Sequence, residues 1–165
     1  MTDQDGFELS AAVALWRGEE LLVMKRAAGF SEGGWFLPGG HLEEGERPAE
    51  AAARELREET CIDVDRSLLA LADVMTYRHG DRTAHCLVYN VACPPGAEAV
   101  LNDEHVVARW LTPGEYIRRF LDATALRERG LPESAVALAE EVARVVRAAA
   151  RARGLPQSLP SSPPG

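Results

Sequence analysis

The stretch GHLEEGERPAEAAARELREETCI, residues 40 to 62, sets a glycine-containing loop directly before an acidic run of strong helix formers. Pro48 suits the first turn of a helix, where its missing N–H leaves no bond unmade, and the alanines, glutamates and arginines that follow favour helix. We therefore predict a helix from about 48 to 60. Just upstream, Gly39 and Gly40 free the backbone for close approach to another group.

Three glutamates of this predicted helix project from one face. Glu55, Glu58 and Glu59 stand at i, i+3 and i+4, positions that are neighbours on a helix surface. Pairs four apart, such as Arg54 with Glu58, also permit a salt-bridged, solvated face with no function. The competing interpretation is a site for a hard divalent cation, since Mg²⁺ prefers carboxylate oxygens and keeps positions for substrate phosphates. The glycine loop would then lie beside the metal.

The same residues carry a resemblance to a known family. From Gly40 the chain reads G-x5-E-x7-R-E-L-x-E-E-x-C-I, with Glu46 and Arg54 at the spaced positions. This resembles the Nudix box, G-x5-E-x7-R-E-U-x-E-E-x-G-U, in which U is a bulky aliphatic residue. One position departs, because Cys61 stands where the family has glycine. That glycine is expected to end the helix in a left-handed conformation, which costs a residue with a Cβ roughly 1 to 2 kcal/mol.

The resemblance, which is to MutT-like members of the family and covers about residues 7 to 122, implies a fold and an activity. Nudix domains fold as an α/β/α sandwich around a mixed β-sheet, so we expect an α/β protein. Members hydrolyse a nucleoside diphosphate linked to another group X, with Mg²⁺ or Mn²⁺ as cofactor. We expect a small nucleotide-type diphosphate as substrate, with nucleoside triphosphate pyrophosphohydrolysis as the leading activity. The alternative is a nucleotide-binding or regulatory module without turnover, for which Cys61 is the warning sign.

The resemblance also implies roles for the residues of the box. Arg54 matches the arginine that orients the carboxylates, and Glu46 would pair with it. A backbone carbonyl of Gly39 or Gly40 would complete the metal shell. The residues that match the metal-binding carboxylates, among them the candidates for the general base, are Glu55, Glu58 and Glu59.

A further glutamate and two cations extend the candidate site. In MutT-type members a glutamate six residues before a tryptophan in a late strand serves the metal or acts as the base, and here Glu104 precedes Trp110 by six. The competing interpretation of Glu104 is an ordinary surface residue. Lys25 and Arg26, at the end of a predicted strand, could reach substrate phosphates as similar residues do in related enzymes, or could be strand-edge charges.

Other polar residues give weaker signals. MutT-type enzymes that act on oxidised guanine nucleotides use an asparagine beyond the late tryptophan, whereas both asparagines of this chain precede Trp110. Strict oxidised-guanine specificity is therefore not supported. The histidines have no mutual spacing that demands a metal or a triad, and structural or surface roles are favoured for all of them: His41, His79, His85 and His105.

Outside the box, the hydrophobic pattern predicts the remaining elements. Apolar, partly alternating runs indicate strands at 7 to 16, 20 to 26, 35 to 38, 68 to 78, 83 to 93 and 105 to 111. The loop after the third of these is expected to run to about Arg47. Thr112 is a suitable N-cap for a second helix over 112 to 121. Apolar residues at helical spacing predict a third, amphipathic helix at about 132 to 153.

Length and composition favour one domain over residues 1 to 153, followed by a Pro/Ser-rich tail, 154 to 165, that we expect to be disordered. The net charge of −8 argues against a nucleic-acid polymer as partner, since such binding depends on Lys and Arg. No apolar run is long enough for a membrane span. Three cysteines without ligand spacing fit a reducing cytoplasm. The third helix is expected to pack back on its own domain, with a homodimer as the alternative.

Overall fold

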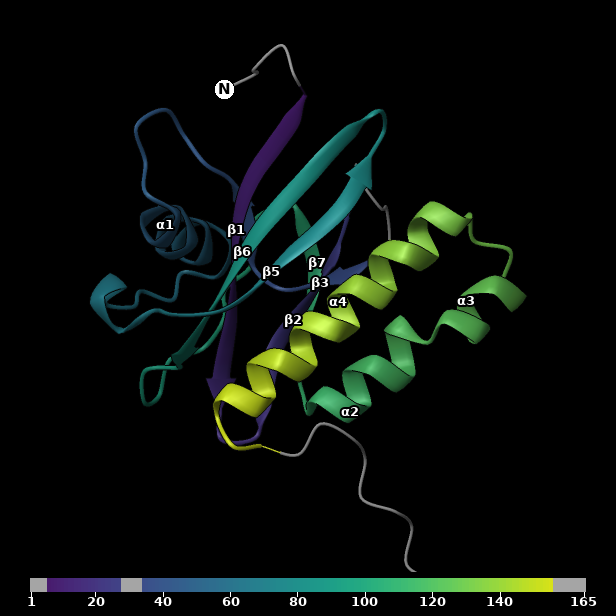
Figure 1. The fold of residues 1–165 in the computed structure, drawn as a ribbon. Coiled ribbons are helices and arrows are strands. Elements are labelled where there is room, and N and C mark those ends of the chain that lie inside the picture. The colour runs from purple at the N-terminus through teal and green to yellow at the C-terminus, as the bar shows by residue number, and fades with distance from the viewer. Residues whose placement is uncertain (1–5, 28–33, 156–165) are drawn as a thin grey trace, which may run out of the picture.

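A computed structural model describes residues 6–27 and 34–155 of the chain, and Figure 1 shows their arrangement. The strands are β1 (Phe7–Arg17), β2 (Glu20–Arg26), β3 (Trp35–Phe36), β4 (Gly39–His41), β5 (Ala70–His79), β6 (Arg82–Ala92) and β7 (His105–Leu111). The helices are α1 (Pro48–Thr60), the 3-10 turn η1 (Arg66–Leu68), α2 (Pro113–Tyr116), the π-helical turn η2 (Ile117–Leu121), α3 (Ala123–Glu128) and α4 (Glu133–Ala152). The predicted disordered tail lies outside these residues from position 156 onward.

The strands form one mixed sheet. The order is β3-β2-β1-β6-β5, with β4 also paired to β1 and β7 to β2. β1 runs parallel to β6 along its length, from Phe7 opposite Thr83 to Trp16 opposite Ala92, while the other pairs are antiparallel. The predicted hairpin at the start of the chain is confirmed by the pairing of Trp16 with Leu21. The mixed sheet agrees with the expected α/β class.

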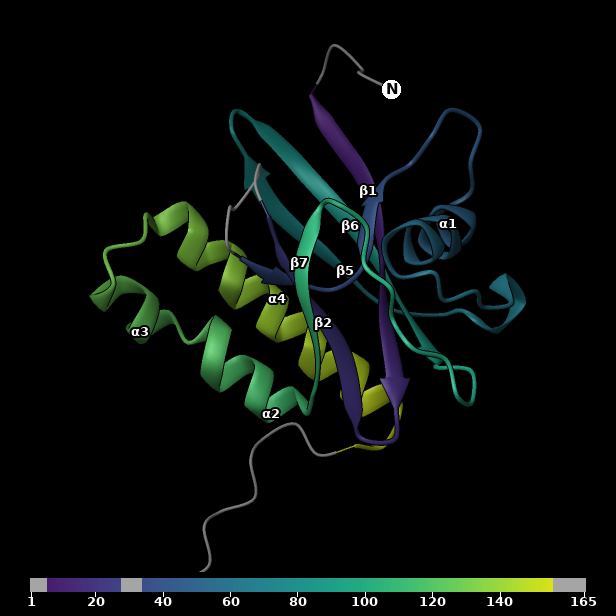
Figure 2. The same ribbon diagram turned by 180° about the vertical axis from the view of Figure 1, so that it is seen from behind.

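The alternation of side chains along β1 divides the core into two layers. Ala11, Val13 and Leu15 pack with α1, whereas the residues between them face α4, as expected when successive side chains of a strand point to opposite faces. Figures 1 and 2 show α1 on one side of the sheet and α2, α3 and α4 on the other. The expected α/β/α sandwich is confirmed.

The predicted first helix is confirmed, and so is the conformation of its end. α1 spans Pro48–Thr60, and the Glu50 carboxylate accepts a hydrogen bond from the N–H of Arg47 at 3.1 Å. Cys61 follows with φ 59° and ψ 10°, in the left-handed region. The helix therefore ends with the geometry that glycine gives in the family pattern.

One expectation about local structure was wrong, and the predicted second helix is confirmed with a difference in detail. The segment after Pro38 is not all loop, because Gly39–His41 forms β4 against Ser10, Ala11 and Ala12. Glycine is depleted in strands, so residue propensity does not predict a strand there. The second helix ends its α-helical part at Tyr116, continues as a π-helical turn, and is followed by α3, which had not been predicted.

α4 lies across the sheet and covers the free edge of β5. The residues predicted to form its apolar stripe, Leu138, Val142, Val145 and Ala149, are all buried. Glu141 accepts the N–H of Thr76 at 2.9 Å. Arg144 donates to the carbonyl oxygen of Val74 at 2.8 Å and to Asp73 at 2.7 Å. Helix and strand are thus joined by both apolar and polar contacts.

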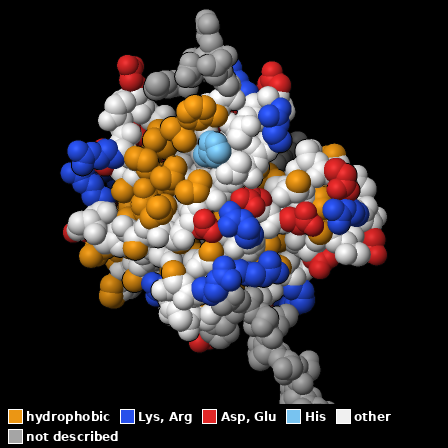
Figure 3. All heavy atoms as spheres, in the orientation of Figure 1, with side chains coloured by type: hydrophobic (Ala, Val, Ile, Leu, Met, Phe, Trp, Pro, Cys, Tyr) orange, Lys and Arg blue, Asp and Glu red, His pale blue; other side chains and the backbone are white. Residues whose placement is uncertain are grey.

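The other face of the sheet is only partly covered, because α1 packs on β1, β4 and β6 rather than on β5. Phe7, Leu9 and Leu71 remain 45%, 41% and 55% exposed. Figure 3 shows hydrophobic side chains gathered on this part of the surface, beside α4. Within the part of the chain that the structure describes, no helix has the length and hydropathy that a bilayer crossing requires.

Candidate metal and active site

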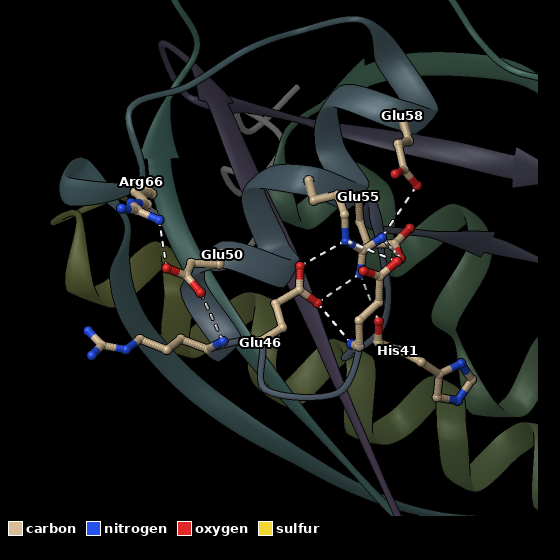
Figure 4. A network of polar contacts seen from close by, with 9 residues as sticks. His41, Glu46, Glu50, Glu55, Glu58 and Arg66 are labelled. Atoms are coloured by element: carbon tan, nitrogen blue, oxygen red, sulfur yellow. Dashed lines mark hydrogen bonds and ion pairs between the residues drawn. The ribbon is translucent and has the colours of Figure 1, made fainter. Parts of the chain in front are cut away.

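Arg54 lies at the centre of a network of carboxylates on α1 and the loop before it. Its Nε and Nη2 donate to the two carboxylate oxygens of Glu46 at 2.8 and 3.0 Å. Its Nη1 donates to Glu55 at 2.7 Å and to Glu58 at 3.4 Å, and Nη2 also reaches the carbonyl oxygen of His41 at 3.0 Å. Figure 4 shows Glu46, Glu55 and Glu58 with these contacts as dashed lines. One guanidinium thus fixes three acidic side chains.

Glu46 acts as the anchor of this arginine. The hydrogen bonds from Arg54 lower the pKa of Glu46, and the N–H of Glu43 adds a bond to the same carboxylate at 2.9 Å. The hydrogen bonds that Arg54 donates to Glu46 and Glu55 raise the pKa of Arg54 in turn. A two-point arginine–carboxylate pair fixes direction as well as distance. The loop before α1 is thereby tied to the helix, in the pairing expected from the sequence.

Glu59 and Glu55 are carboxylates held out of water. Glu59 is only 2% exposed, and its Oε2 accepts the N–H of Gly39 at 2.9 Å. Burial raises its pKa to about 8. Burial also raises the pKa of Glu55, although Arg54 acts in the opposite direction. Because burial disfavours the charged form, a cation bound here would stabilise both carboxylates in their ionised state. Glu58 has a half-exposed side chain.

The two glycines of β4 bring bare backbone against these carboxylates. A Cβ on Gly40 would lie 2.5 Å from Oε1 of Glu55. A Cβ on Gly39 would lie 2.5 Å from the carbonyl oxygen of Ala11 in β1. A side chain at either position would displace one of these groups, so the close approach predicted for the glycine pair is present.

The segment before β7 is fastened to the C-terminal end of α1. The N–H of Asn102 donates to the carbonyl oxygen of Glu59 at 3.3 Å, and its Oδ1 accepts the N–H of Glu104 at 3.2 Å. These bonds bring Glu104 to the helix. One ligand atom from each of Glu59, Glu104 and His105 lies within 4.8 Å of the others. Glu104 is exposed but faces the buried pair.

His105 belongs to this cluster although the spacing of the histidines gave no reason to select it. It is buried, with Nε2 4.0 Å from Oε1 of Glu59, and burial lowers its pKa. The ring is therefore neutral near pH 7 and offers a nitrogen lone pair. Alternation along a strand would place His105 on the face opposite Glu104. β7 begins only at His105, so that rule does not extend to Glu104.

The side chains of Lys25 and Arg26 lie in different surroundings. Arg26 lies near the buried cluster, where its positive charge contributes to lowering the pKa of His105. Its Nε is buried and, among the described residues, has no hydrogen-bond partner. Lys25 instead lines a hollow between β2 and α3–α4. Of the two predicted phosphate contacts, Arg26 is therefore the one beside the carboxylates.

The donors gathered here fit a hard divalent cation. Glu55 and Glu59 lie against the backbone of Gly40 and Gly39, Glu104 lies close to Glu59, and Arg54 holds Glu58 on the same helix. Carboxylate oxygen is the donor that Mg²⁺ and Mn²⁺ prefer. Burial raises the pKa values of Glu55 and Glu59, and a bound cation would act in the opposite direction by stabilising their ionised forms. These are the residues that would hold the metal.

Comparison with known proteins identifies the family. The family model for the NUDIX domain matches residues 6–132. A protein called "MutT-like protein" from Streptomyces ambofaciens is 34% identical over 119 residues, which cover 71% of each chain. An "8-oxo-dGTP diphosphatase" from Proteus vulgaris is 34% identical over 83 residues, covering 50% of this chain and 72% of that one.

Solved structures of MutT proteins share this fold. The crystal structure of a MutT protein from Methanosarcina mazei Go1 superposes with a TM-score of 0.63 at 22% identity, over 87% of this chain and 97% of that one. That likeness concerns the fold alone. Together with the family match, it defines the class of protein, an α/β/α sandwich with a carboxylate-bearing helix. The chain belongs to the Nudix family, and it is a Nudix hydrolase.

Proposed function

We propose that this protein hydrolyses the diphosphate linkage of a nucleoside diphosphate joined to a group X, with Mg²⁺ or Mn²⁺, and that nucleoside triphosphates are its leading substrates. The observation that carries the proposal is the contact of Glu55 and Glu59 with the glycine backbone of β4, with Glu58 held nearby on α1 by Arg54 and Glu104 brought in from the segment before β7. Family membership supports hydrolysis of this kind of compound. The choice of X is our inference.

In the proposed mechanism, bound Mg²⁺ or Mn²⁺ would offset the diphosphate charge and make a bound water a better nucleophile. Arg54 keeps the carboxylates in place, and Glu46 keeps Arg54 in place. A carboxylate among Glu58, Glu59 and Glu104 accepts the proton that the attacking water loses. Water adds to phosphorus, the bridging P–O bond breaks, and the leaving phosphate carries the electron pair.

The positions of the asparagines support a substrate range wider than oxidised guanine nucleotides. Both polar groups of Asn90 are occupied inside the protein, since Oδ1 accepts from Trp16 at 2.7 Å and Nδ2 donates to the carbonyl of Ala149 at 3.0 Å. The Oδ1 of Asn102 is occupied by the N–H of Glu104. Asn90 is therefore committed to the interior, and Asn102 is engaged with the segment before β7, which supports general triphosphate hydrolysis.

The alternative is a binding or regulatory module without turnover, and it rested on Cys61. Because Cys61 takes the left-handed conformation and its N–H donates to Arg57 at 2.9 Å, the helix end keeps the geometry that the glycine would give. This observation supports an active enzyme over the alternative.

The test is turnover. Purified protein is incubated with a panel of nucleoside triphosphates, nucleotide sugars and dinucleotides plus Mg²⁺, and inorganic phosphate is measured with and without added phosphatase. Glu59→Gln should lower the rate by at least about a hundredfold, as loss of metal-site groups commonly does. Glu128→Gln, which changes an exposed residue of α3, is the matched control and should leave the rate unchanged. A folded protein with no turnover on any substrate would favour the binding module.

A further inference from the structure

The hollow that Lys25 lines is on the side of the sheet away from α1. It has a volume of about 620 Å³ and opens between the ends of β2 and β3, the tip of the β5–β6 hairpin, and α3 with α4. Leu121, Leu126 and Leu138 give it an apolar floor. Trp35 and Phe120 line it as a stacked pair with ring centres 4.5 Å apart. Its size and lining are those of a site for a small molecule.

The charges around this hollow are all positive. Lys25, Arg78, Arg119 and Arg129 line it, and no Asp or Glu is among its described lining residues. The whole protein carries a net charge of −8, so this local excess is opposite to the average. Cations that gather around a concave surface raise the local concentration of anions.

These four cations are not held in salt bridges within the described residues, although Arg119 is near enough to Glu115 to contribute to lowering its pKa. Among the described residues none of them forms an ion pair, whereas Arg54, Arg127 and Arg144 all do. Arg78 donates instead to the carbonyl oxygen of Asp81 and to the hydroxyl of Thr83. The positive charge at the rim is therefore available to an external anion.

The hollow adjoins the candidate active site through a smaller pocket of about 170 Å³. Phe36, His79 and Leu138 line both hollows, and the smaller one is also lined by Gly39 and Gly40. A molecule with its diphosphate at these glycines could extend through the smaller pocket. Its far end would then lie among the cations.

We propose that this cationic hollow binds a phosphate-bearing, nucleotide-sized part of the substrate that lies distant from the bond to be broken. The inference rests on the proposed hydrolysis of a nucleoside diphosphate joined to X. It adds to the nucleoside triphosphates a class of substrate in which X, or the group opposite X, carries a phosphate of its own. The apolar and aromatic floor suits the body of such a group, and the arginines suit its phosphate. A small molecule is favoured over a polymer because the site is concave and the chain as a whole carries a net charge of −8.

The test measures binding without turnover. AMP is titrated into the metal-free protein in EDTA by isothermal calorimetry, for the wild type and for Arg119→Gln/Arg129→Gln. Loss of the two charge-assisted contacts should weaken AMP binding by about tenfold or more. The matched control is Arg118→Gln/Arg147→Gln, which removes the same charge from exposed residues that do not line the hollow, and it should stay within twofold of the wild type.

Steady-state kinetics with Mg²⁺ extend the test. Arg119→Gln/Arg129→Gln should raise the KM for diadenosine tetraphosphate about tenfold, with kcat within twofold. If both double variants bind AMP like the wild type while Glu59→Gln abolishes hydrolysis, this inference is wrong and the proposed function stands. If AMP binding depends on Arg119 and Arg129 but the wild type hydrolyses nothing, the hollow is a binding site and the proposed function fails.

Discussion

Cys61 is the one non-glycine residue of the described ranges with a positive φ, 59°. Its N–H donates to the carbonyl oxygen of Arg57 at 2.9 Å, and its side chain is exposed. The bond that ends the helix is therefore made without glycine, and what remains is the local strain of a Cβ in the left-handed region. Cys61 thus lowers the stability of the protein through its backbone strain, while the helix end that it forms leaves Glu58 and Glu59 in position.

Cys61→Gly should stabilise the protein by about 1 kcal/mol, because the strain removed exceeds the added entropy of the unfolded glycine. For a chain of this size that corresponds to a rise in Tm of roughly 2 to 4 °C. Thermal unfolding of the metal-free protein under reducing conditions measures it. Cys61→Ala keeps the Cβ and should show no gain, and equal stability of the two variants would contradict the argument.

At the scale of residues, the sequence predicted the site residues whose relative positions follow from the period of the helix. Glu55, Glu58 and Glu59 share a face because 3.6 residues complete a turn, whatever the rest of the chain does. The place of Glu104 depends on the bond between Asn102 and the carbonyl of Glu59. No local pattern encodes that contact. The resemblance to the family was needed to select Glu104, and nothing selected His105.

At the scale of elements, β4 places two glycines with different tasks. Gly40 faces the carboxylate of Glu55, the end of a flexible side chain, whereas Gly39 lies against the backbone of Ala11 and Ala12. The difference decides what a methyl group would disturb at each position.

Gly40→Ala should lower metal-dependent hydrolysis by about tenfold or more at little cost in stability, because Glu55 can swing away from the new methyl group but then leaves its place beside the metal. Gly39→Ala should instead lower the free energy of unfolding by about 1 to 3 kcal/mol, since β1 backbone has to move. Urea unfolding and initial rates of both variants check the pair. Equal losses of stability in the two variants would contradict this distinction between Gly39 and Gly40.

The elements themselves were predicted where local pattern and tertiary packing agree. α1 and α4 have strong helix formers and an apolar stripe, and both were placed within about two residues. β4 was missed because pairing with β1, not strand propensity, makes Gly39–His41 a strand. α3 was missed because Ala123–Glu128 is a single short helix that is stabilised by packing near α4.

At the scale of the whole molecule, α4 and β5 are joined by a charge cluster. The N–H of Val74 and the guanidinium of Arg144 lower the pKa of Asp73, and Arg144 lowers the pKa of Glu141. Carboxyl groups with a lowered folded-state pKa bind fewer protons when folded than when unfolded near pH 4. Their contribution to stability is therefore complete above the unfolded-state pKa and is lost as the pH falls through the folded-state values.

Arg144→Gln should cost about 1 kcal/mol at pH 7, discounted because the cluster is partly exposed. The difference in Tm between wild type and variant should shrink as the pH falls below about 4. Thermal unfolding at pH 7, 5 and 3 measures the trend. Arg147→Gln, an exposed change on the same helix, should give no difference at any pH. A constant difference for Arg144→Gln would mean that its charge contributes nothing.

The same two side chains have a consequence for the behaviour of many copies of this protein together. An open strand edge invites the strand of a neighbour to join it, and Glu141 and Arg144 already occupy the N–H of Thr76 and the carbonyl of Val74. A shortened chain that stops before position 133 would expose that edge together with the apolar surface beneath α4. Such a fragment would be prone to aggregate during expression. In the full chain, α4 prevents the β5 edge of one copy from pairing with a strand of another.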